Sequence, residues 1–298
     1  VAATIAIVDR VGNVLGVART TGAPAYVTVS SNFELGPAVS GGLDGLNFIP
    51  SSLAAIAKAV TGAYLSTGGN AFSSRTASQI IQENFNPGER DVPSGPLFGV
   101  QFSQLPCSDF SQRFTAGVGV GPHRSPLGLA ADPGGLPLYM NGVPVGGVGV
   151  VADGVYGLDK DISNRDFDLD ELIAVAATFG YAAPTAIRAD QISLGGKTGR
   201  FTDVGVNDLL TDPAAAATFA TLTAGGIIQL QSVPGYYDAA AGLLAGTVFG
   251  QPASGIRAAD GSVFKSVRGE SLDAFIFVDA ANSNRYPARD GVDTPDGD

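Results

Sequence analysis

Two segments that lie far apart in the sequence each consist of two short apolar runs joined by a tight turn. The first spans residues 2–18, where residues 9–13 (DRVGN) connect two runs that alternate as β-strands do. The second spans residues 136–151, where Asn141-Gly142 supplies a two-residue turn that favours left-handed backbone angles. Two such hairpins predict an antiparallel sheet.

Three further stretches have apolar residues at helical spacing. Residues 53–65 follow Ser51-Ser52, whose hydroxyl groups predict a capped helix start. A short helix is expected over Thr76–Glu83, and another over residues 169–180, where Gly180 predicts the helix end. Helices that flank an antiparallel sheet indicate an α/β fold of the α+β type.

The pattern of apolar and turn-forming residues changes at about residue 187. Residues 1–187 hold the hairpins and the three helices, with a Pro-, Gly- and Ser-rich loop insertion at about 88–133. Residues 188–298 hold short apolar runs between turn-rich stretches, and an alanine-rich helix is expected near 213–224. We expect them to form an extension or wrapping arm on the first domain. Its last residues, 282–298, are polar and acidic and predict an exposed tail.

Acidic residues outnumber basic ones, which excludes several classes of partner. The chain has 28 Asp and Glu against 17 Lys and Arg, a formal net charge of -11. A field of this sign repels phosphate backbones and anionic lipids, so no nucleic acid partner is expected. No run of 18 or more apolar residues is present, so no membrane span is expected. The Lys-poor composition, rich in Gly, Ala and Asp, favours a periplasmic or extracellular protein.

No complete catalytic or nucleotide-binding motif is present in the sequence. The single cysteine, Cys107, excludes an internal disulfide framework and, without ligands from another chain, a cysteine-based metal cluster. The pattern Gly147-x-Gly149-x-x-Ala152 falls inside a predicted antiparallel hairpin, which is the wrong context for dinucleotide binding. The pattern that ends in Gly196-Lys197-Thr198 has Gln191 in place of the first P-loop glycine.

Three segments stand out, in this order: residues 5–24 (IAIVDRVGNVLGVARTTGAP), 54–63 (AAIAKAVTGA) and 134–150 (GGLPLYMNGVPVGGVGV). Together they resemble the GlcG/HbpS-like family of haem-degrading domains. The resemblance covers residues 1 to about 185, interrupted by the loop insertion. It implies a profilin- or PAS-like α/β domain with an antiparallel sheet and helices on its faces. Members of the family are often oligomeric, and some bind haem.

The sequence departs from the family pattern at its start. Members of the family usually have a helix before the first strand, whereas this sequence begins in that strand. A sheet without that helix would expose apolar surface. We therefore expect a second polypeptide or another segment to supply the helix, within an oligomer or a hetero-complex.

His123 is the only histidine, and therefore the only imidazole available to a haem iron. Its glycine and proline neighbours indicate a loop, and a hydrogen-bonded loop histidine is the alternative. Tyr139 and Met140 could also be axial ligands, although in an alternating strand they more often serve packing. A hydrolase built on Ser125 and His123 has no nucleophile-elbow pattern to support it.

Two basic residues in the family-like segments are candidates for binding a ligand carboxylate. Arg19 follows the first hairpin and Lys58 lies on the first helix. Both side chains would converge on an anion if the helix packs across the end of the sheet. The alternative is that both residues take part in ordinary packing and salt bridges.

An acidic segment before the last predicted helix is a candidate calcium loop. Calcium prefers several oxygen ligands from one short loop, and the spacing resembles the start and finish of an EF-hand loop. The candidate ligands are Asp159, Asp161, Ser163, Asp166 and Asp170. The pattern is imperfect, because Asn164 replaces the turn glycine and Asp170 replaces the bidentate glutamate. In the alternative, the loop is solvated and Asp170 and Glu171 stabilise the helix N-terminus.

These observations support two functional hypotheses. The first is a haem- or small-ligand-binding protein of the GlcG/HbpS-like type, acting outside the cytoplasm within a larger assembly. The second is a structural or scaffold subunit stabilised by calcium, without catalytic turnover. A third hypothesis, an enzyme that acts on a small anionic metabolite, is not supported by a complete set of catalytic residues.

Overall fold

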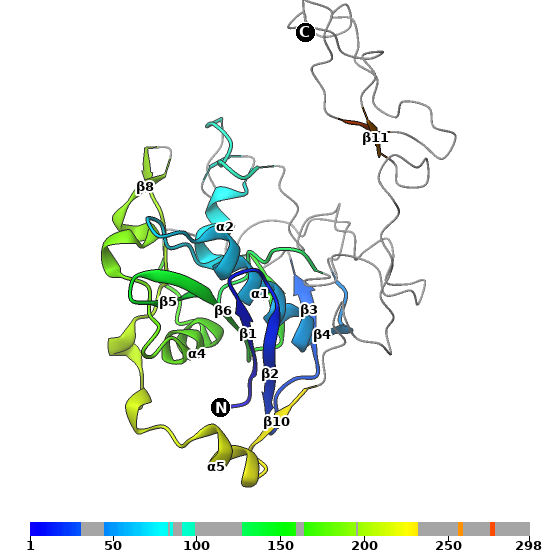
Figure 1. Cartoon of the computed structure of the whole chain (residues 1–298), viewed down its shortest axis with the longest axis vertical. Coiled ribbons are helices and arrows are strands. Elements are labelled where there is room, and N and C mark those ends of the chain that lie inside the picture. Colours follow the sequence, from blue (N-terminus) through cyan, green and yellow to red (C-terminus); the bar gives the residue numbers. More distant parts are fainter. Residues whose placement is uncertain are drawn as a thin grey trace, which may run out of the picture. The chain divides into compact units, whose positions relative to one another are not determined.

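The computed structural model describes residues 1–30, 45–82, 84–85, 91–98, 127–158, 164–194, 196–231, 256–258 and 275–277 (Figure 1). The chain forms two compact units, residues 1–235 and 236–298. In the described part of the second unit, strand β11 (Ile256–Ala258) pairs antiparallel with β12 (Phe275–Phe277). The candidate site lies in the first unit.

Five antiparallel strands form the main sheet of the first unit, in the order β10-β2-β1-β6-β5. They are β1 (Thr4–Asp9), β2 (Val14–Thr20), β5 (Gly135–Met140), β6 (Val143–Val151) and β10 (Ile228–Leu230). Both predicted hairpins are confirmed, as β1–β2 and β5–β6. Asn141 and Gly142 have φ angles of 52° and 79°, which are the left-handed angles of a two-residue hairpin turn.

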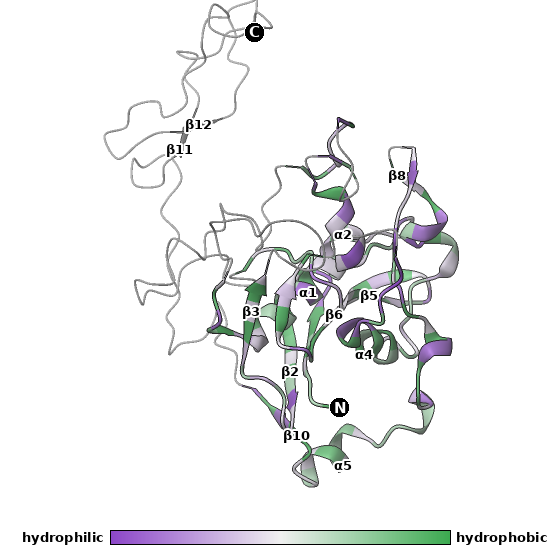
Figure 2. Ribbon diagram, turned by 180° about the vertical axis from the view of Figure 1, so that it is seen from behind, coloured by the Kyte–Doolittle hydropathy of each residue, from purple (hydrophilic) through white to green (hydrophobic). Residues whose placement is uncertain are grey.

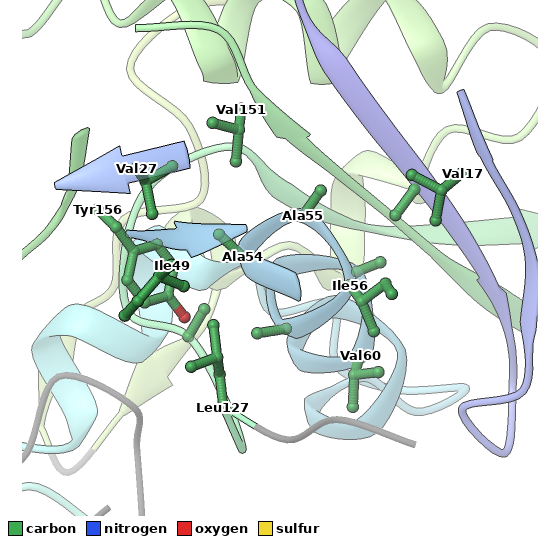
Figure 3. Packing of buried hydrophobic residues seen from close by; sticks show 14 of the residues in the cluster. Val17, Val27, Ile49, Ala54, Ala55, Ile56, Val60, Leu127, Val151 and Tyr156 are labelled. Atoms are coloured by element: carbon green, nitrogen blue, oxygen red, sulfur yellow. The ribbon is translucent and has the colours of Figure 1, made fainter. Parts of the chain in front are cut away.

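Helix α1 (Ser51–Leu65) lies between the main sheet and a smaller one, and 11 of its 15 residues are buried. The small sheet consists of β4 (Ile49–Pro50), β3 (Tyr26–Ser30) and β7 (Val155–Gly157), with β3 in the centre. Figure 3 shows the side chains that surround the helix, among them Val17 and Val151 from the main sheet and Val27 and Tyr156 from the small one. A helix that is apolar on almost every side is stable only in such a buried position.

The opposite face of the main sheet is covered by helix α4 (Leu169–Ala177) and by residues 201–204. Because neighbouring residues of a strand point to opposite faces, Val150 packs towards α4 whereas Val151 packs towards α1. Figure 2 shows both hydrophobic and hydrophilic colour on α4, as expected for a helix with one buried face. The α+β class, an antiparallel sheet with flanking helices, is therefore confirmed.

Short elements complete the first unit. They are α2 (Ser74–Ile80), η2 (Thr185–Ile187), η3 (Ala189–Gln191), β8 (Ser193–Leu194), β9 (Lys197–Thr198), η4 (Val206–Asp208), η5 (Pro213–Ala215) and α5 (Phe219–Ala224). The described parts of the expected loop insertion, residues 91–98 and 127–133, contain no helix or strand. None of the helices in the described ranges is long and apolar enough to cross a membrane.

Several predicted helix ends were wrong. Ser51 does not cap α1, because its hydroxyl donates to the carbonyl of Pro24 at 2.8 Å and no side chain caps the helix. The second helix, predicted over Thr76–Glu83, begins at Ser74 and ends at Ile80. The third helix ends at Ala177, three residues before Gly180, which follows with a φ of 79°.

The alanine-rich helix expected near 213–224 is present only in part. Its first half is the 3-10 turn η5, and α5 begins at Phe219 after Thr218, which caps it.

The hairpin of β1 and β2 leaves apolar side chains uncovered, since Ile7 is 41% exposed and Leu15 67%. The second polypeptide or segment expected to cover this part of the sheet stays a prediction.

Candidate functional site

Lys58 lies in the middle of α1 and is completely buried. Its Nζ forms salt bridges with Oδ2 of Asp132, in the loop before β5, and with Oδ2 of Asp170 at 2.6 Å, in the first turn of α4. The Lys58 side chain therefore links α1 to the loop before β5 and to the first turn of α4. Burying an ammonium group is costly unless it is paired and hydrogen-bonded, and here two carboxylates provide that pairing.

The two carboxylates also hold the backbone of the neighbouring strands. Oδ1 of Asp170 accepts hydrogen bonds from the backbone N–H groups of Ala152 at 2.6 Å and Asp153 at 3.3 Å, just after β6. Oδ1 of Asp132 accepts from the N–H of Gly157, in β7, at 2.7 Å. The Lys58 cluster thus joins α1 and α4 to both sheets.

A second buried cluster surrounds Arg75 in α2, which is 1% exposed. Its Nε donates to Oε1 of Glu171 at 2.8 Å, and its Nη1 lies 3.0 Å from Oδ2 of Asp203 and 3.6 Å from Oδ2 of Asp166. The other oxygen of Glu171 accepts from the backbone N–H of Asp203 at 2.7 Å. Because Asp170 and Glu171 are adjacent, the first turn of α4 carries one acid of each cluster.

Burial shifts three acids of these clusters, Asp132, Asp170 and Glu171, towards their neutral forms. Desolvation raises the pKa of Asp170 to about 6 and that of Glu171 to about 7, although Lys58 and Arg75 oppose the shift. Desolvation likewise raises the pKa of Asp132 well above its ordinary value. Burial alone would lower the pKa of Lys58, but attraction to Asp132 and Asp170 outweighs it and raises that pKa. The ammonium therefore stays charged.

The free energy of unfolding is expected to fall as the pH rises from about 5 to about 7.5. In this range folded Glu171 and Asp170 keep protons that the unfolded chain has released, because burial raises their pKa to about 7 and about 6. The expected loss is on the order of 1–3 kcal/mol per group. Chemical denaturation at the two pH values measures it.

The matched variant is Glu171→Gln, which copies the protonated acid and removes one titrating group. It should show a smaller loss between about pH 5 and about 7.5 than the unmodified chain. A stability that stays flat over this range in both proteins would show that these carboxyls titrate as exposed ones do.

A small pocket borders the Lys58 cluster. It is lined by Asp132, Pro133, Asp153, Val155, Gly157, Leu158, Asp166 and Asp168. Its volume is about 10 Å³, which accommodates about one water-sized group. Four of the lining residues are aspartates, and the exposed Asp153 and half-buried Asp168 leave carboxylate oxygens accessible. The pocket can therefore accept hydrogen bonds or attract positive charge, whereas it repels an anion.

The structure brings together some of the residues selected from sequence. Lys58 and Asp170, predicted for different ligands, form a salt bridge with each other, which is the alternative considered for Lys58. Asp166 lies beside Arg75 and on the pocket wall. Arg19 lies elsewhere, with its guanidinium donating to the carbonyl of Ala23. Four candidates, His123, Asp159, Asp161 and Ser163, lie outside the described residues.

The two strand residues considered as haem ligands have ordinary surroundings. The hydroxyl of Tyr139 donates to the carbonyl of Thr67 at 2.7 Å, and Met140 is 52% exposed at the end of β5. Within the described ranges, no group of three or more His, Cys, Asp or Glu side chains is arranged to hold a metal ion. The calcium loop stays a prediction, since three of its five residues lie outside those ranges.

Sequence reasoning missed Arg75, Asp132, Asp153 and Asp203. One signal could have found the first of them. Arg75 is the only charged residue in the helix SRTASQI, just as Lys58 is in α1. A single basic residue in a helix that is otherwise apolar or small predicts a buried ion pair, because such a helix has no charged face to present to solvent. No comparable sequence pattern marks Asp132, Asp153 or Asp203.

The fold and site together define an α+β domain with two buried ion clusters and an acidic pocket beside one of them. No family model, curated protein or solved structure matches this chain.

Proposed function

We propose that this chain is a small-ligand-binding protein of the GlcG/HbpS-like type, with a profilin- or PAS-like arrangement of its sheet, acting in an extracytoplasmic assembly. One observation supports the proposal above all others: four aspartates line a pocket beside the buried Lys58 cluster. Stability alone does not account for such a cluster, because apolar replacements of buried ion pairs are often neutral or stabilising. Buried acids with raised pKa beside a pocket are typical of functional sites.

The chemistry of the pocket favours a ligand that carries positive charge or several hydrogen-bond donors. Asp153 and Asp168 offer oxygens to such a ligand, whereas the ammonium of Lys58 is already engaged by Asp132 and Asp170. An anionic ligand would meet like charges at the rim. The carboxylate-binding role predicted for Arg19 and Lys58 is therefore not part of this proposal.

Haem is the ligand that the family resemblance suggests. His123 would be its axial ligand, because it is the only imidazole in the chain. This part of the proposal rests on the resemblance alone, and it is separate from the acidic pocket, whose charge disfavours the haem propionates.

The second candidate function is a scaffold subunit stabilised by calcium. One observation favours it: Asp166 and Asp168, at the end of the predicted calcium loop, line the pocket together with Asp132 and Asp153. Leu158, which precedes the loop, lies on the same wall. Carboxylate oxygens are the ligands that calcium prefers. In this role the ion would hold the loop in place and nothing would turn over.

Thermal unfolding with three separate ligands distinguishes these functions. The ligands are spermidine, an organic cation of which one ammonium group is small enough to enter the pocket, haem, and calcium with reversal by EDTA. A ligand present at about 100 times its Kd should raise the Tm by about 5–10 °C. We expect this rise with spermidine, and we expect the double variant Asp153→Asn/Asp168→Asn to weaken binding at least about tenfold.

The matched control is Asp190→Asn, which removes the same charge from an exposed position outside the pocket. It should bind within about twofold of the unmodified chain. A Soret band that is lost in His123→Ala would support haem as the ligand. A response to calcium alone would favour the scaffold, and no response to any of the three ligands would contradict the binding proposal.

A further inference from the structure

The segment from Leu210 to Leu230 crosses from the end of η4 to the edge of the main sheet without burying a single residue. Leu210 is 90% exposed, Phe219 50% and Leu230 61%. The segment nevertheless has defined structure, since it contains η5, α5 and β10. We call residues 210–230 the arm, and Figure 1 shows it passing below the sheet to β10.

The arm has the composition of an interface and not of a solvated surface. Residues 213–237 contain no Asp, Glu, Lys or Arg, although charged residues make up 15% of the chain. Figure 2 shows α5 in hydrophobic colour. Exposed segments that stay in water normally carry charge, and large exposed apolar surfaces mark sites of association.

Both ends of the arm are attached to the folded unit. Before it, Asp208 forms a salt bridge with Arg165 at 2.9 Å. At its far end β10 pairs with β2, and the ladder continues on each side of the strand. The N–H of Thr21 donates to the carbonyl of Ile227 at 3.0 Å, and the N–H of Gln231 donates to the carbonyl of Val17 at 2.8 Å. Residues 210–227, which lie between these two attachments, include no buried residue.

We infer that the arm is exchanged between two copies of this chain, so that β10 of each copy completes the main sheet of the other. The ladder between β10 and β2 is the same whichever copy supplies β10. Because the connection has no buried residues, moving it to another copy breaks no core packing. Exchange of an identical element is a common, low-cost route to a two-fold dimer.

The apolar and uncharged surface of the arm favours the exchanged dimer over two separate copies. Two arms that cross between copies bury against each other the apolar side chains that one copy leaves in water, such as Leu210 and Phe219. Each copy also carries a net charge of -11, so two copies repel each other least along residues 213–230 of the arm, which contain no charged side chain. A second copy is the partner that fits, because the receiving strand β2 belongs to this same chain. The inference does not depend on the ligand of the acidic pocket.

A disulfide across the ladder tests the exchange in the full chain. Ala18 and Leu230 are directly opposite each other. They lie between the hydrogen-bonded positions 17/231 and 19/229, where the Cα atoms of a pair are about 4.5 Å apart and suit a disulfide. With Cys107→Ser to remove the native thiol, Ala18→Cys/Leu230→Cys is oxidised and run on a non-reducing gel. Exchange gives a covalent dimer, whereas an unexchanged arm gives a monomer band.

The control is Met140→Cys/Val143→Cys in the same background, two exposed residues paired within one hairpin. It should give only the monomer band. Light scattering provides a second measurement, because the unmodified chain should have twice the 30.1 kDa mass of one copy. Leu210→Ser/Phe219→Ser should raise the Kd of the dimer at least about tenfold, and Phe179→Ser, exposed outside the arm, should leave it unchanged. A monomeric mass, or a dimer whose cross-link stays within one chain, would overturn the inference.

Discussion

Replacing Lys58 by methionine is expected to lower the free energy of unfolding by about 3–5 kcal/mol at neutral pH. Methionine keeps most of the stem of the side chain but removes the ammonium, so Asp132 and Asp170 lose the charge that both of them face. Both carboxylates are buried, with Asp132 7% and Asp170 2% exposed, so water replaces the lost ammonium only in small part. Urea denaturation followed by circular dichroism measures the loss.

The same variant should be less damaged at low pH. Burial already raises the pKa of Asp170 to about 6, and removal of the ammonium would raise it further. At about pH 5 the acid is then neutral and no longer needs a cation, so the loss shrinks. Adding Asp170→Asn to Lys58→Met should likewise recover part of the stability at neutral pH, because one of the two uncompensated charges is removed.

Arg165→Met is the matched control for this prediction. It removes another basic side chain from a salt bridge, with Asp208, but the side chain of Arg165 is 66% exposed. Exposed pairs contribute little, so a loss below about 1 kcal/mol is expected. If Lys58→Met were to cost no more than Arg165→Met, water would have to reach the cluster and the site would not be closed as described.

The elements that could be predicted from sequence are those determined by neighbouring residues. The two hairpins follow from alternation and from a turn such as Asn141-Gly142, in which both residues adopt left-handed angles. The position of α1 follows from its apolar spacing. Its start was predicted wrongly because the hydroxyl of Ser51 bonds to the carbonyl of Pro24, and such a tertiary partner leaves no local pattern.

The site could be predicted only one residue at a time. Lys58 and Asp170 were both selected, but for different ligands, because 112 residues separate them and only the packed fold brings them together. Glu171 lies 96 residues from Arg75 for the same reason. The sequence shows which residues can carry charge, whereas the order of strands and helices decides which charges meet. That order depends on long-range packing, which local propensity does not contain.

Gly149→Ala in β6 is expected to lower the free energy of unfolding by about 3 kcal/mol or more. A Cβ at Gly149 would overlap the backbone carbonyl of Ala55 and lie only 2.5 Å from the backbone N of Ala59. Both atoms belong to α1, so the helix would have to move away from the sheet that it packs on. The pattern Gly147-x-Gly149, set aside as a dinucleotide motif, thus serves close packing of helix on strand.

The matched control for this last prediction is Gly16→Ala in β2 of the same sheet. A Cβ at Gly16 meets nothing within 4 Å, so the change should be within about 0.5 kcal/mol or slightly stabilising. Because the clash at Gly149 is with backbone atoms, Ala55→Gly should not rescue Gly149→Ala. Equal effects of the two glycine substitutions, measured by urea denaturation, would contradict the close approach of α1 to β6 that places Lys58 beside its two carboxylates.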